Sequence, residues 1–442
     1  MPKAINFRLT IDFSHQPIIA FFTQDLPMNN IPKDKNPDST LSLMLEGFPF
    51  IRNRCQRYGS DIFETRLMLQ KTVCLHGEEA AKIFYDPARF KRKGAAPKRI
   101  QKTLFGEKGV QTLDGEAHRH RKAAFMSLMT RDHIQLLMQM LENNWRLYIH
   151  KWETVDSLVL YDEVQELLCR ASSKWAGVPM QESEVKNRAK DYGLMVDAFG
   201  AIGPRHLRGR LARTRAENWM KGIVKQIRSG QLTPEPGTAA HLFSWHQDLK
   251  GKLLPEKVAA VEIINIIRPI VAIARYITFS ALAMHEHPEY RQKLQTGEAD
   301  MEEIFAQEVR RFYPFGPFLG ARVKKDFEWG GYHFPKNRLV LLDIWGTNRD
   351  EKQWEEPDRF WPERFRNWNG SPFNFIPQGG GDFMANHRCA GEWITIEVMK
   401  QAINILANKI NYRVPEQDLG FSLVRMPTIP RSRFVISDVK VK

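Results

Sequence analysis

The sequence Phe373–Glu392, FNFIPQGGGDFMANHRCAGE, places three successive glycines and a cysteine in one loop that leads into an apolar helix expected to begin near Gly391. Glycine lets a backbone approach a flat ligand closely, and the free N–H groups at a helix N-terminus stabilise a thiolate. A cysteine at an arbitrary position is more often a buried structural residue. Here the neighbouring glycines and the helix start instead favour a metal-ligating thiolate at Cys389.

The overall composition is that of a large globular protein. The chain has 442 residues, 43% of them hydrophobic, and a formal net charge of +14. Such a charge suits nucleic acid, an anionic membrane surface or an acidic small molecule. The basic residues are scattered, without a Lys/Arg tail or an aromatic-interleaved binding module, so we expect no nucleic-acid partner. The four cysteines lie far apart and lack zinc-finger spacing, so neither a disulfide framework nor a structural zinc site is expected.

Two apolar segments bear on export and membrane insertion. The run 17–22 is too short for a signal peptide, and no small-residue cleavage site follows it. The stretch 258–284 is long enough to cross a bilayer, but it contains Glu262, Arg268 and Arg275. Charged groups of this kind each cost about 2.5–3.5 kcal/mol at a membrane centre. We therefore expect a buried helix there, no membrane span and a cytoplasmic protein.

Apolar positions recur mostly with helical spacing, which predicts a mainly α protein with a small β portion. Helices are expected over 40–58, 77–85, 115–128, 132–150, 160–176, 181–200, 208–229, 255–285, 288–296, 301–313 and 391–409. Strands are expected near 61–75, 317–330, 338–342 and after 411. The clearest internal break is the loop 231–237, but apolar patterning continues on both sides of it. We predict an N-terminal extension over 1–39 and a single domain over 40–442.

A second motif lies on the expected helix 301–313. Glu308 and Arg311 stand one helical turn apart and can therefore pair, and Arg364 follows within the segment WPERF. An isolated pair of this kind is usually a surface ion pair of little energetic weight. The order Glu308, Arg311, Arg364 and then Cys389 along the chain is what distinguishes these residues from an isolated surface ion pair.

A third motif, Asp114–Lys122, opens another expected helix. His118 and Lys122 stand at i and i+4 on that helix, so both can reach one ligand group. A solvated basic face is the alternative interpretation.

In combination, the three motifs resemble the cytochrome P-450 superfamily. The resemblance implies the P-450 fold, in which haem b (iron protoporphyrin IX) lies between a long distal helix and the cysteine loop, with Cys389 as iron ligand. It also implies that the three charged residues of the second motif brace the cysteine side. His118 and Lys122 would contact a haem propionate, where the family usually has Trp and Arg. Thiolate ligation favours O–O bond cleavage, which explains the need for cysteine.

The expected distal helix departs from most of that superfamily. Ordinary members carry an acid followed by an alcohol, whereas this chain has Arg268-Pro269. Proline removes an N–H and kinks a helix, and a buried arginine is costly without a counter-ion. The counter-ion could be internal, such as Glu262, or it could be a substrate carboxylate held by a bidentate fork.

Arg268-Pro269 resembles the fatty-acid peroxygenase group of the superfamily, which the chain matches from about residue 40 onward. The resemblance implies a long-chain fatty acid with its carboxylate on Arg268, hydrogen peroxide as oxidant and no obligatory redox partner. The carboxylate would act as the acid–base group, and the product would be a 2- or 3-hydroxy acid, or a terminal alkene with CO2.

Gln111 stands where the olefin-forming member of this group carries histidine and the hydroxylating members carry glutamine. Because glutamine is neutral at any working pH, we predict mainly hydroxylation, with decarboxylation as a minor outcome. Phe105 is expected to pack against the same pocket wall, although a plain core aromatic is the alternative role.

Other functions remain open from the sequence. The same fold could serve a predominant fatty-acid decarboxylase, or a conventional monooxygenase with a redox partner, although Arg268-Pro269 argues against the latter. A basic haem-binding sensor or nucleic-acid partner would show a steep salt dependence of binding and no peroxide turnover. A cysteine-nucleophile hydrolase built on Cys389 would need a base such as His387 within hydrogen-bond reach.

Overall fold

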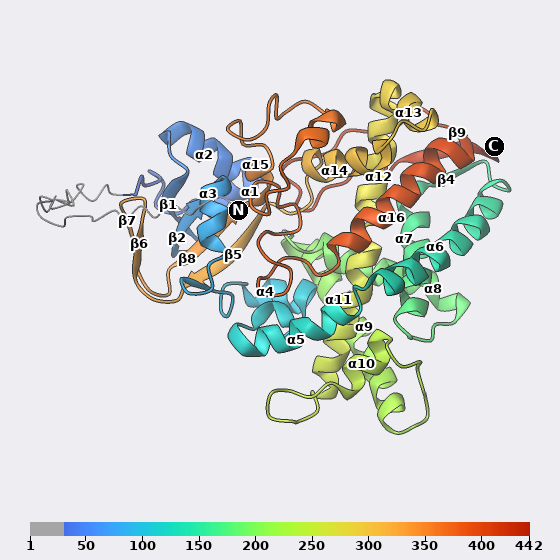
Figure 1. Ribbon diagram of the computed structural model, residues 1–442, viewed down its shortest axis with the longest axis horizontal. Coiled ribbons are helices and arrows are strands. Elements are labelled where there is room, and N and C mark those ends of the chain that lie inside the picture. Colours follow the sequence, from blue (N-terminus) through green and yellow to red (C-terminus); the bar gives the residue numbers. More distant parts are fainter. Residues whose placement is uncertain (1–30) are drawn as a thin grey trace, which may run out of the picture.

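The computed structural model describes residues 31–442, which form a mainly α structure with a small β portion, as predicted (Figure 1). The α-helices are α1 (Thr40–Glu46), α2 (Phe50–Tyr58), α3 (Glu78–Phe84), α4 (Lys98–Ile100), α5 (Gly115–Ser127), α6 (Arg131–Trp152), α7 (Leu160–Trp175), α8 (Val185–Asp197), α9 (Gly203–Arg228), α10 (Ala239–Trp245), α11 (Glu256–Ala272), α12 (Ala274–Glu286), α13 (Pro288–Gln295), α14 (Met301–Phe312), α15 (Ile344–Thr347) and α16 (Glu392–Asn404). Short 3₁₀ or π segments are η1 (Gln101–Phe105), η2 (Val110–Thr112), η3 (Glu182–Glu184), η4 (Pro362–Asn367) and η5 (Ile405–Lys409).

The strands form three small sheets. They are β1 (Ile62–Leu67), β2 (Gln70–Leu75), β3 (Phe90–Lys91), β4 (Ser157–Val159), β5 (Phe318–Val323), β6 (Phe327–Trp329), β7 (Tyr332–Phe334), β8 (Leu339–Asp343), β9 (Ile410–Arg413) and β10 (Val435–Val441). The largest sheet has the order β1-β2-β8-β5-β3, and β2 and β8 pair in parallel with Val73 opposite Val340. Its strands gather at one side of the molecule and the long helices at the other (Figure 1).

The expected N-terminal extension lies largely outside the described residues, which begin at residue 31. The part that is described packs against β1 and α2. The backbone N–H of Asp34 donates to the carbonyl of Glu64, and the buried Asp34 carboxylate accepts from Arg54 Nε at 2.6 Å. Residues 31–39 therefore contact the body of the protein through a buried ion pair.

The helix expected over 40–58 is two helices, α1 and α2. Gly47 ends α1 with φ of 68°, a left-handed conformation that favours glycine, and Pro49 precedes α2. A Cβ atom on Gly47 would lie 2.0 Å from the carbonyl oxygen of Leu423, so the close approach of the C-terminal segment also requires glycine.

The apolar stretch expected to form one helix over 255–285 is also divided, between α11 and α12. Pro269 lies inside α11 and has no N–H to bond four residues back. Four residues later, the Ile273 N–H bonds the carbonyl of Ile270 at 3.0 Å, an i to i−3 bond, before α12 begins. Residues 258–284 are almost entirely buried, as expected.

The main apolar core is built around α11 and α12 and extends to α6, α7, α9, α10 and α16. Helices on both sides of the loop 231–237 contribute to this core, through Ile227 of α9 and Phe243 of α10. The break in the sequence pattern is therefore a surface loop. Among the described residues, no helix combines the length and apolarity needed to cross a bilayer.

Candidate active site

A cavity of about 420 Å³ lies between α11 and the cysteine loop. Arg268 and Pro269 of α11 line it, as do Cys389 and Gly391 of the loop, so the structure brings together the two features that the sequence singled out. Much of the remaining wall is apolar and comes from Ala95, Pro97, Ile100, Leu104, Phe105, Val196, Phe199, Ala272, Phe315, Phe318, Leu319, Leu341 and Pro427.

Cys389 is held by a buried polar cluster on the cysteine side. Its backbone N–H donates to the carbonyl of Gln378 at 3.0 Å. The Gln378 side chain accepts from Arg310 at 3.0 Å, and Arg310 also pairs with Glu392 in the first turn of α16. Arg388 Nε donates to the second oxygen of Glu392 at 2.7 Å. Two arginines and one carboxylate thus fix the loop on both sides of the cysteine.

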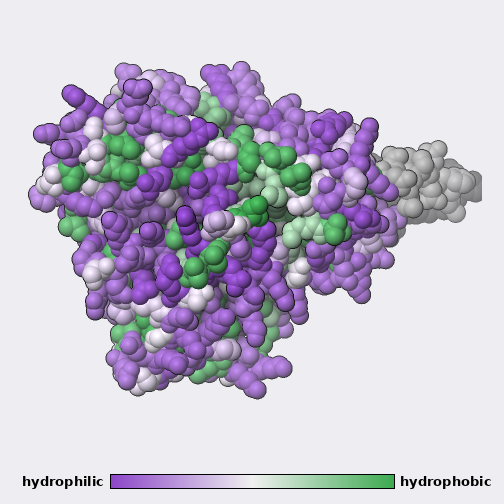
Figure 2. All heavy atoms as spheres, turned by 180° about the vertical axis from the view of Figure 1, so that it is seen from behind, coloured by the Kyte–Doolittle hydropathy of each residue, from purple (hydrophilic) through white to green (hydrophobic). Residues whose placement is uncertain are grey.

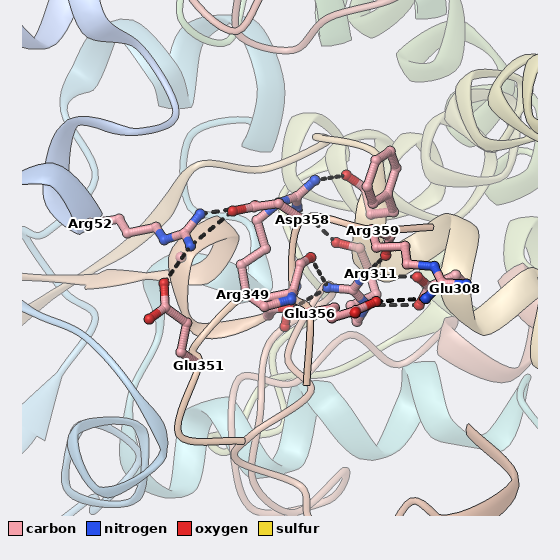
Figure 3. A network of polar contacts seen from close by, with 12 residues as sticks. Arg52, Glu308, Arg311, Arg349, Glu351, Glu356, Asp358 and Arg359 are labelled. Atoms are coloured by element: carbon pink, nitrogen blue, oxygen red, sulfur yellow. Dashed lines mark hydrogen bonds and ion pairs between the residues drawn. The ribbon is translucent and has the colours of Figure 1, made fainter. Parts of the chain in front are cut away.

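The second motif forms a buried ion-pair network at the end of α14. Arg311 makes a bidentate contact with Glu308 at 2.7 and 2.8 Å, and Arg364 Nε approaches the same carboxylate at 3.4 Å. Figure 3 shows Glu308 and Arg311 connected through Arg349 to Asp358 and Arg52.

This network connects separated parts of the chain. Arg311 also donates to the backbone carbonyls of Asn348, Pro357 and Arg359, and Glu308 accepts from the Trp361 N–H at 2.7 Å. Each extra bond fixes the long loop that precedes the cysteine segment. The geometry fits the bracing role that the family resemblance implies for Glu308, Arg311 and Arg364.

Arg268 is buried, with 7% of its surface exposed, and it lines the cavity. Burial, with the nearby charge of Arg213, lowers the pKa of Arg268 to about 9. Within residues 31–442 no carboxylate lies within 4.0 Å of its guanidinium, and Nε has no hydrogen-bond partner. A buried guanidinium in this state gains stability from an arriving anion.

Glu262, the internal counter-ion considered for Arg268, forms an ion pair with a different arginine. Glu262 is fully buried and accepts from Arg121 Nη1 of α5 at 2.7 Å. Burial raises the pKa of the Glu262 carboxyl, and the Arg121 contact opposes this shift. The hypothesis that Glu262 neutralises Arg268 is therefore wrong.

Asn265 connects the polar groups above the cavity, and the sequence analysis gave it no role. Its Nδ2 lies 3.2 Å from Glu262 Oε2 and 3.3 Å from Gln111 Oε1. Its Oδ1 accepts from Arg268 Nη2 at 3.4 Å. The i, i+3 spacing of Glu262, Asn265 and Arg268 on a helix placed at the cavity was the available signal.

Gln111 and Phe105 both line the cavity, as expected. Gln111 lies in η2 and reaches Asn265 through its side-chain oxygen. Phe105 ends η1; its carbonyl accepts from Asn265 Nδ2 at 3.0 Å, and its ring packs in a small cluster with Leu104. Asn265 therefore joins both segments to the helix that carries Arg268.

His118 and Lys122 lie on α5 and also line the cavity. The His118 ring stacks on His387 with centroids 3.8 Å apart, and burial lowers the pKa of His118 to about 4. Lys122 Nζ donates to the carbonyl of Arg388, directly before the cysteine. Contact of these two side chains with a haem propionate stays a prediction.

Arg92 is a further cation in the cavity wall that the sequence analysis did not single out. Its guanidinium lies 4.2 Å from the ring centre of Phe84, and burial lowers the pKa of Arg92. No carboxylate of the described residues lies within 4.0 Å of it. Its place in the basic run 90–99 was visible in the sequence, but nothing there separated it from its neighbours.

The residues present fit a flat, anionic, thiolate-ligated group. A Cβ atom on Gly391 would meet nothing within 4 Å, so there is open space beside Cys389. Burial raises the pKa of the Cys389 thiol and the Lys122 ammonium opposes that shift, while a bound metal ion deprotonates a coordinating thiol. The cations Arg92 and Lys122 lie in the same cavity as the cysteine and suit a ligand that carries carboxylates.

Comparison with known proteins identifies similar chains and a matching family. The family model described as cytochrome P450 matches residues 303–419. The structure of cytochrome P450EX alpha (CYP152N1) with myristic acid has a TM-score of 0.90 and 48% identity, covering 93% of this chain and 99% of that one. Cytochrome P450SP alpha (CYP152B1) in complex with (R)-ibuprophen has a TM-score of 0.90 and 49% identity, covering 92% and 100%. A variant of cytochrome P450 OleT in complex with arachidonic acid has a TM-score of 0.90 and 37% identity, covering 93% and 99%.

Curated relatives match over shorter segments. Cytochrome P450 3A15 of Cavia porcellus is 33% identical over 130 residues, which are 28% of this chain and 25% of that protein. Cytochrome P450 71D2 of Catharanthus roseus is 27% identical over 154 residues, or 33% and 30%. The matches to these two relatives thus span about a quarter to a third of their lengths.

The fold and the cysteine site define a haem-thiolate oxidoreductase with a haem-iron cofactor. Within the cytochrome P450 superfamily the chain belongs to the CYP152 family, which confirms the family expected from the sequence.

Proposed function

We propose that this protein is a fatty-acid peroxygenase that hydroxylates long-chain fatty acids at Cα or Cβ with hydrogen peroxide and releases terminal alkenes as a minor product. The observation that carries the proposal is the buried Arg268, which faces the same cavity as Cys389 and has no carboxylate partner in the described chain. Solved relatives whose structures carry myristic acid or arachidonic acid support the substrate class.

Cys389 would hold the iron of haem b, and Arg92, His118 and Lys122, which line the same cavity, would contact its propionates. When bound, the thiolate-ligated haem iron supplies peroxide O–O bond cleavage and the oxidation of a C–H bond.

Arg268 would hold the substrate carboxylate through a charge-assisted fork, while the apolar wall takes the acyl chain. Fixing the head group places Cα and Cβ closest to the reacting centre, and positioning of this kind selects the site of oxidation. Asn265 keeps the guanidinium in place, because its Oδ1 accepts from Arg268 Nη2 at 3.4 Å.

The substrate carboxylate would supply the acid–base group at the cavity. It takes a proton from hydrogen peroxide and returns it to the departing hydroxyl, which leaves as water. One fatty acid and one peroxide then give one hydroxy acid and one water. On the minor path they give a terminal alkene, CO2 and two waters. Gln111 is neutral and offers no proton, which favours hydroxylation.

The test is incubation of the purified holoenzyme with a saturated C14 to C18 fatty acid and hydrogen peroxide, without any reductase, and gas chromatography of the products. We expect mainly 2- and 3-hydroxy acids, with 1-alkene as a minor product. Absence of all three products would refute the peroxygenase function. Turnover that requires NAD(P)H and a redox protein would instead identify a conventional monooxygenase.

A further inference from the structure

Arg213 of α9 is a charged residue that lies inside the protein. The face shown in Figure 2 is mostly hydrophilic, and most charged side chains of the described residues reach a surface of this kind. Arg213 does not, because only 2% of its surface is exposed. A buried guanidinium is costly unless its N–H groups are bound, so the partners of Arg213 indicate its role.

Arg213 joins α9 to a segment that forms part of the cavity wall. Its Nε donates to Glu217 Oε1 at 2.6 Å, one turn further along the same helix. Its Nη1 donates to the backbone carbonyl of Leu104 in η1 at 3.0 Å. Leu104 and Phe105 of η1 both line the cavity. The guanidinium is therefore fixed to its own helix through Nε and holds η1 through Nη1.

Gly106 shows how closely η1 approaches this guanidinium. Gly106 follows η1 with φ of 79°, a left-handed conformation that favours glycine. A Cβ atom there would lie 2.2 Å from Arg213 Nη2 and 2.4 Å from Val261 Cγ1 of α11. The end of η1, α9 and α11 can meet at this point only because residue 106 has no side chain.

The same segment binds Asn265 of α11. The carbonyl of Phe105, directly after Leu104, accepts from Asn265 Nδ2 at 3.0 Å. Asn265 Oδ1 in turn accepts from Arg268 Nη2 at 3.4 Å. Two adjacent carbonyls of η1 are thus held by two different helices. A shift of η1 away from α9 would move the acceptor of Asn265 and, with it, the group that bonds Arg268.

We propose that Arg213 is a positioning residue for the substrate carboxylate: by holding η1 at Leu104, it keeps Asn265 bonded to Arg268 in the orientation that receives an anion. This role rests on the proposed function, in which Arg268 holds the carboxylate. Arg213 is not among the residues that line the cavity, so it acts through other residues and does not touch the ligand. Displacement of a binding group by about 1 Å can lower a rate about a hundredfold, so a remote residue of this kind matters.

The test is isothermal titration calorimetry of the holoenzyme with myristic acid and with methyl myristate, which has the same acyl chain without the charge. Arg213→Met keeps the length of the side chain and removes its hydrogen bonds. It should weaken binding of the acid about tenfold and leave binding of the ester within about twofold of wild type. Equal weakening of both ligands would indicate a general loss of the cavity wall and overturn the positioning role, as would unchanged acid binding.

Arg215→Met is the matched control. Arg215 is a cation of the same helix that pairs with Asp191, with Nε 3.2 Å from Oδ2, and it donates to no group of η1. This variant should bind the acid and the ester as the wild type does. A loss of acid binding as large as that of Arg213→Met would show that any lost cation of α9 has this effect, and it would contradict the proposal.

A double variant tests the path through Asn265. Asn265→Ala alone should weaken acid binding, and the addition of Arg213→Met should weaken it by no more than about twofold further, because both changes disturb the same contact with Arg268. If the effects of the two single changes add in full, the role of Arg213 does not pass through Asn265.

Glu217→Gln separates positioning from a direct effect of charge, since the charge of Arg213 contributes to the lowered pKa of Arg268. The amide oxygen still accepts from Arg213 Nε, but no carboxylate then offsets the positive charge. Positioning predicts acid binding within about twofold of wild type. Acid binding that is at least about fivefold tighter would assign the effect to charge and overturn the proposal.

Gly106→Ala probes the same contact from η1 and keeps the proposal testable if Arg213→Met does not fold. The added methyl group meets Arg213 Nη2, so binding of the acid should fall while binding of the ester holds. Gly230→Ala, at a glycine with φ of 77° and open space around it, introduces similar backbone strain and should bind both ligands as the wild type does. Unchanged acid binding in Gly106→Ala would overturn the proposal.

Peroxide turnover, measured on the same proteins, separates this inference from the proposed function. If the wild type prefers the acid and Arg213→Met loses that preference, but peroxide yields no hydroxy acid or alkene, the peroxygenase function fails and the positioning role stands. If the wild type turns over the acid and Arg213→Met binds it equally well, the function stands and the positioning role is wrong.

Discussion

Arg121 Nη1 donates to Glu262 Oε1 at 2.7 Å, across the gap between α5 and α11. This ion pair satisfies the one carboxylate that α11 carries beside the cavity, and it leaves Arg268, two turns further along, for a ligand. The pair also holds Asn265 through Glu262 Oε2. The proposed binding of a substrate carboxylate at Arg268 would therefore depend on charges that lie outside the cavity wall.

Arg121→Met should destabilise the protein by about 3–5 kcal/mol, because it leaves the Glu262 carboxylate buried and unpaired. The double variant Arg121→Met/Glu262→Leu removes both charges and should recover most of the loss. Urea denaturation of the three proteins measures the difference. If the double variant is as unstable as the single one, an unpaired buried carboxylate is not the cause.

Replacing Arg268 by Ala should lower kcat/KM for peroxide-driven fatty-acid turnover at least about a hundredfold, because the substrate carboxylate loses its bidentate contact with the guanidinium. Arg268→Lys keeps the positive charge but cannot make the bidentate contact, so its kcat/KM should lie between those of the wild type and Arg268→Ala. The Soret band of the ferrous–CO complex should stay at its thiolate position in both, since Cys389 is untouched. Turnover of Arg268→Ala at the wild-type rate would remove Arg268 from the site.

Gln111→His should raise the share of 1-alkene among the products, because histidine brings a titratable group to the site and glutamine does not. Gln111→Asn, which stays neutral, is the control and should keep the wild-type ratio. Gas chromatography of the products measures the ratio. An unchanged alkene share in Gln111→His would show that this residue does not direct the product.

The protein should lose stability as the pH falls from about 6.5 toward 4, in part through His246. Burial and the Arg121 charge lower the pKa of His246 to about 4, so between these pH values the unfolded chain binds a proton that the folded protein does not. At this half-buried site the loss between pH 7 and pH 5 should be about 1 kcal/mol.

His246→Gln should flatten this pH dependence when the urea midpoint is followed from pH 7 to pH 5. His333→Gln, at an exposed histidine of β7, is the control and should behave as the wild type does. An equal slope in His246→Gln and the wild type would assign the acid sensitivity to other groups.

Much of the site could be predicted because its residues stand in short motifs. Cys389 beside a glycine loop, Arg268-Pro269 in an apolar helix, and Glu308 one turn from Arg311 each carry their chemistry in local sequence. The helices were expected largely where they are, because burial imposes a 3.6-residue period on the apolar positions.

The features that the sequence did not predict depend on contacts between segments that lie far apart along the chain. The division at Gly47 follows from the approach of Leu423, and the partner of Glu262 comes from another helix, so neither can be deduced from local spacing. Asn265 gains its role from carbonyl and amide groups more than 150 positions away in the chain. Arg310, to which the sequence analysis gave no role, pairs with Glu392 of another helix.

The most direct test of the central claim is a comparison of one saturated fatty acid with its methyl ester, each incubated with the holoenzyme and hydrogen peroxide without a reductase. Both have the same acyl chain, but only the acid has the carboxylate that Arg268 is proposed to hold for acid–base work. We expect hydroxy acid from the free acid and at least about a hundredfold slower oxidation of the ester. Oxidation of the ester at a comparable rate would contradict the account.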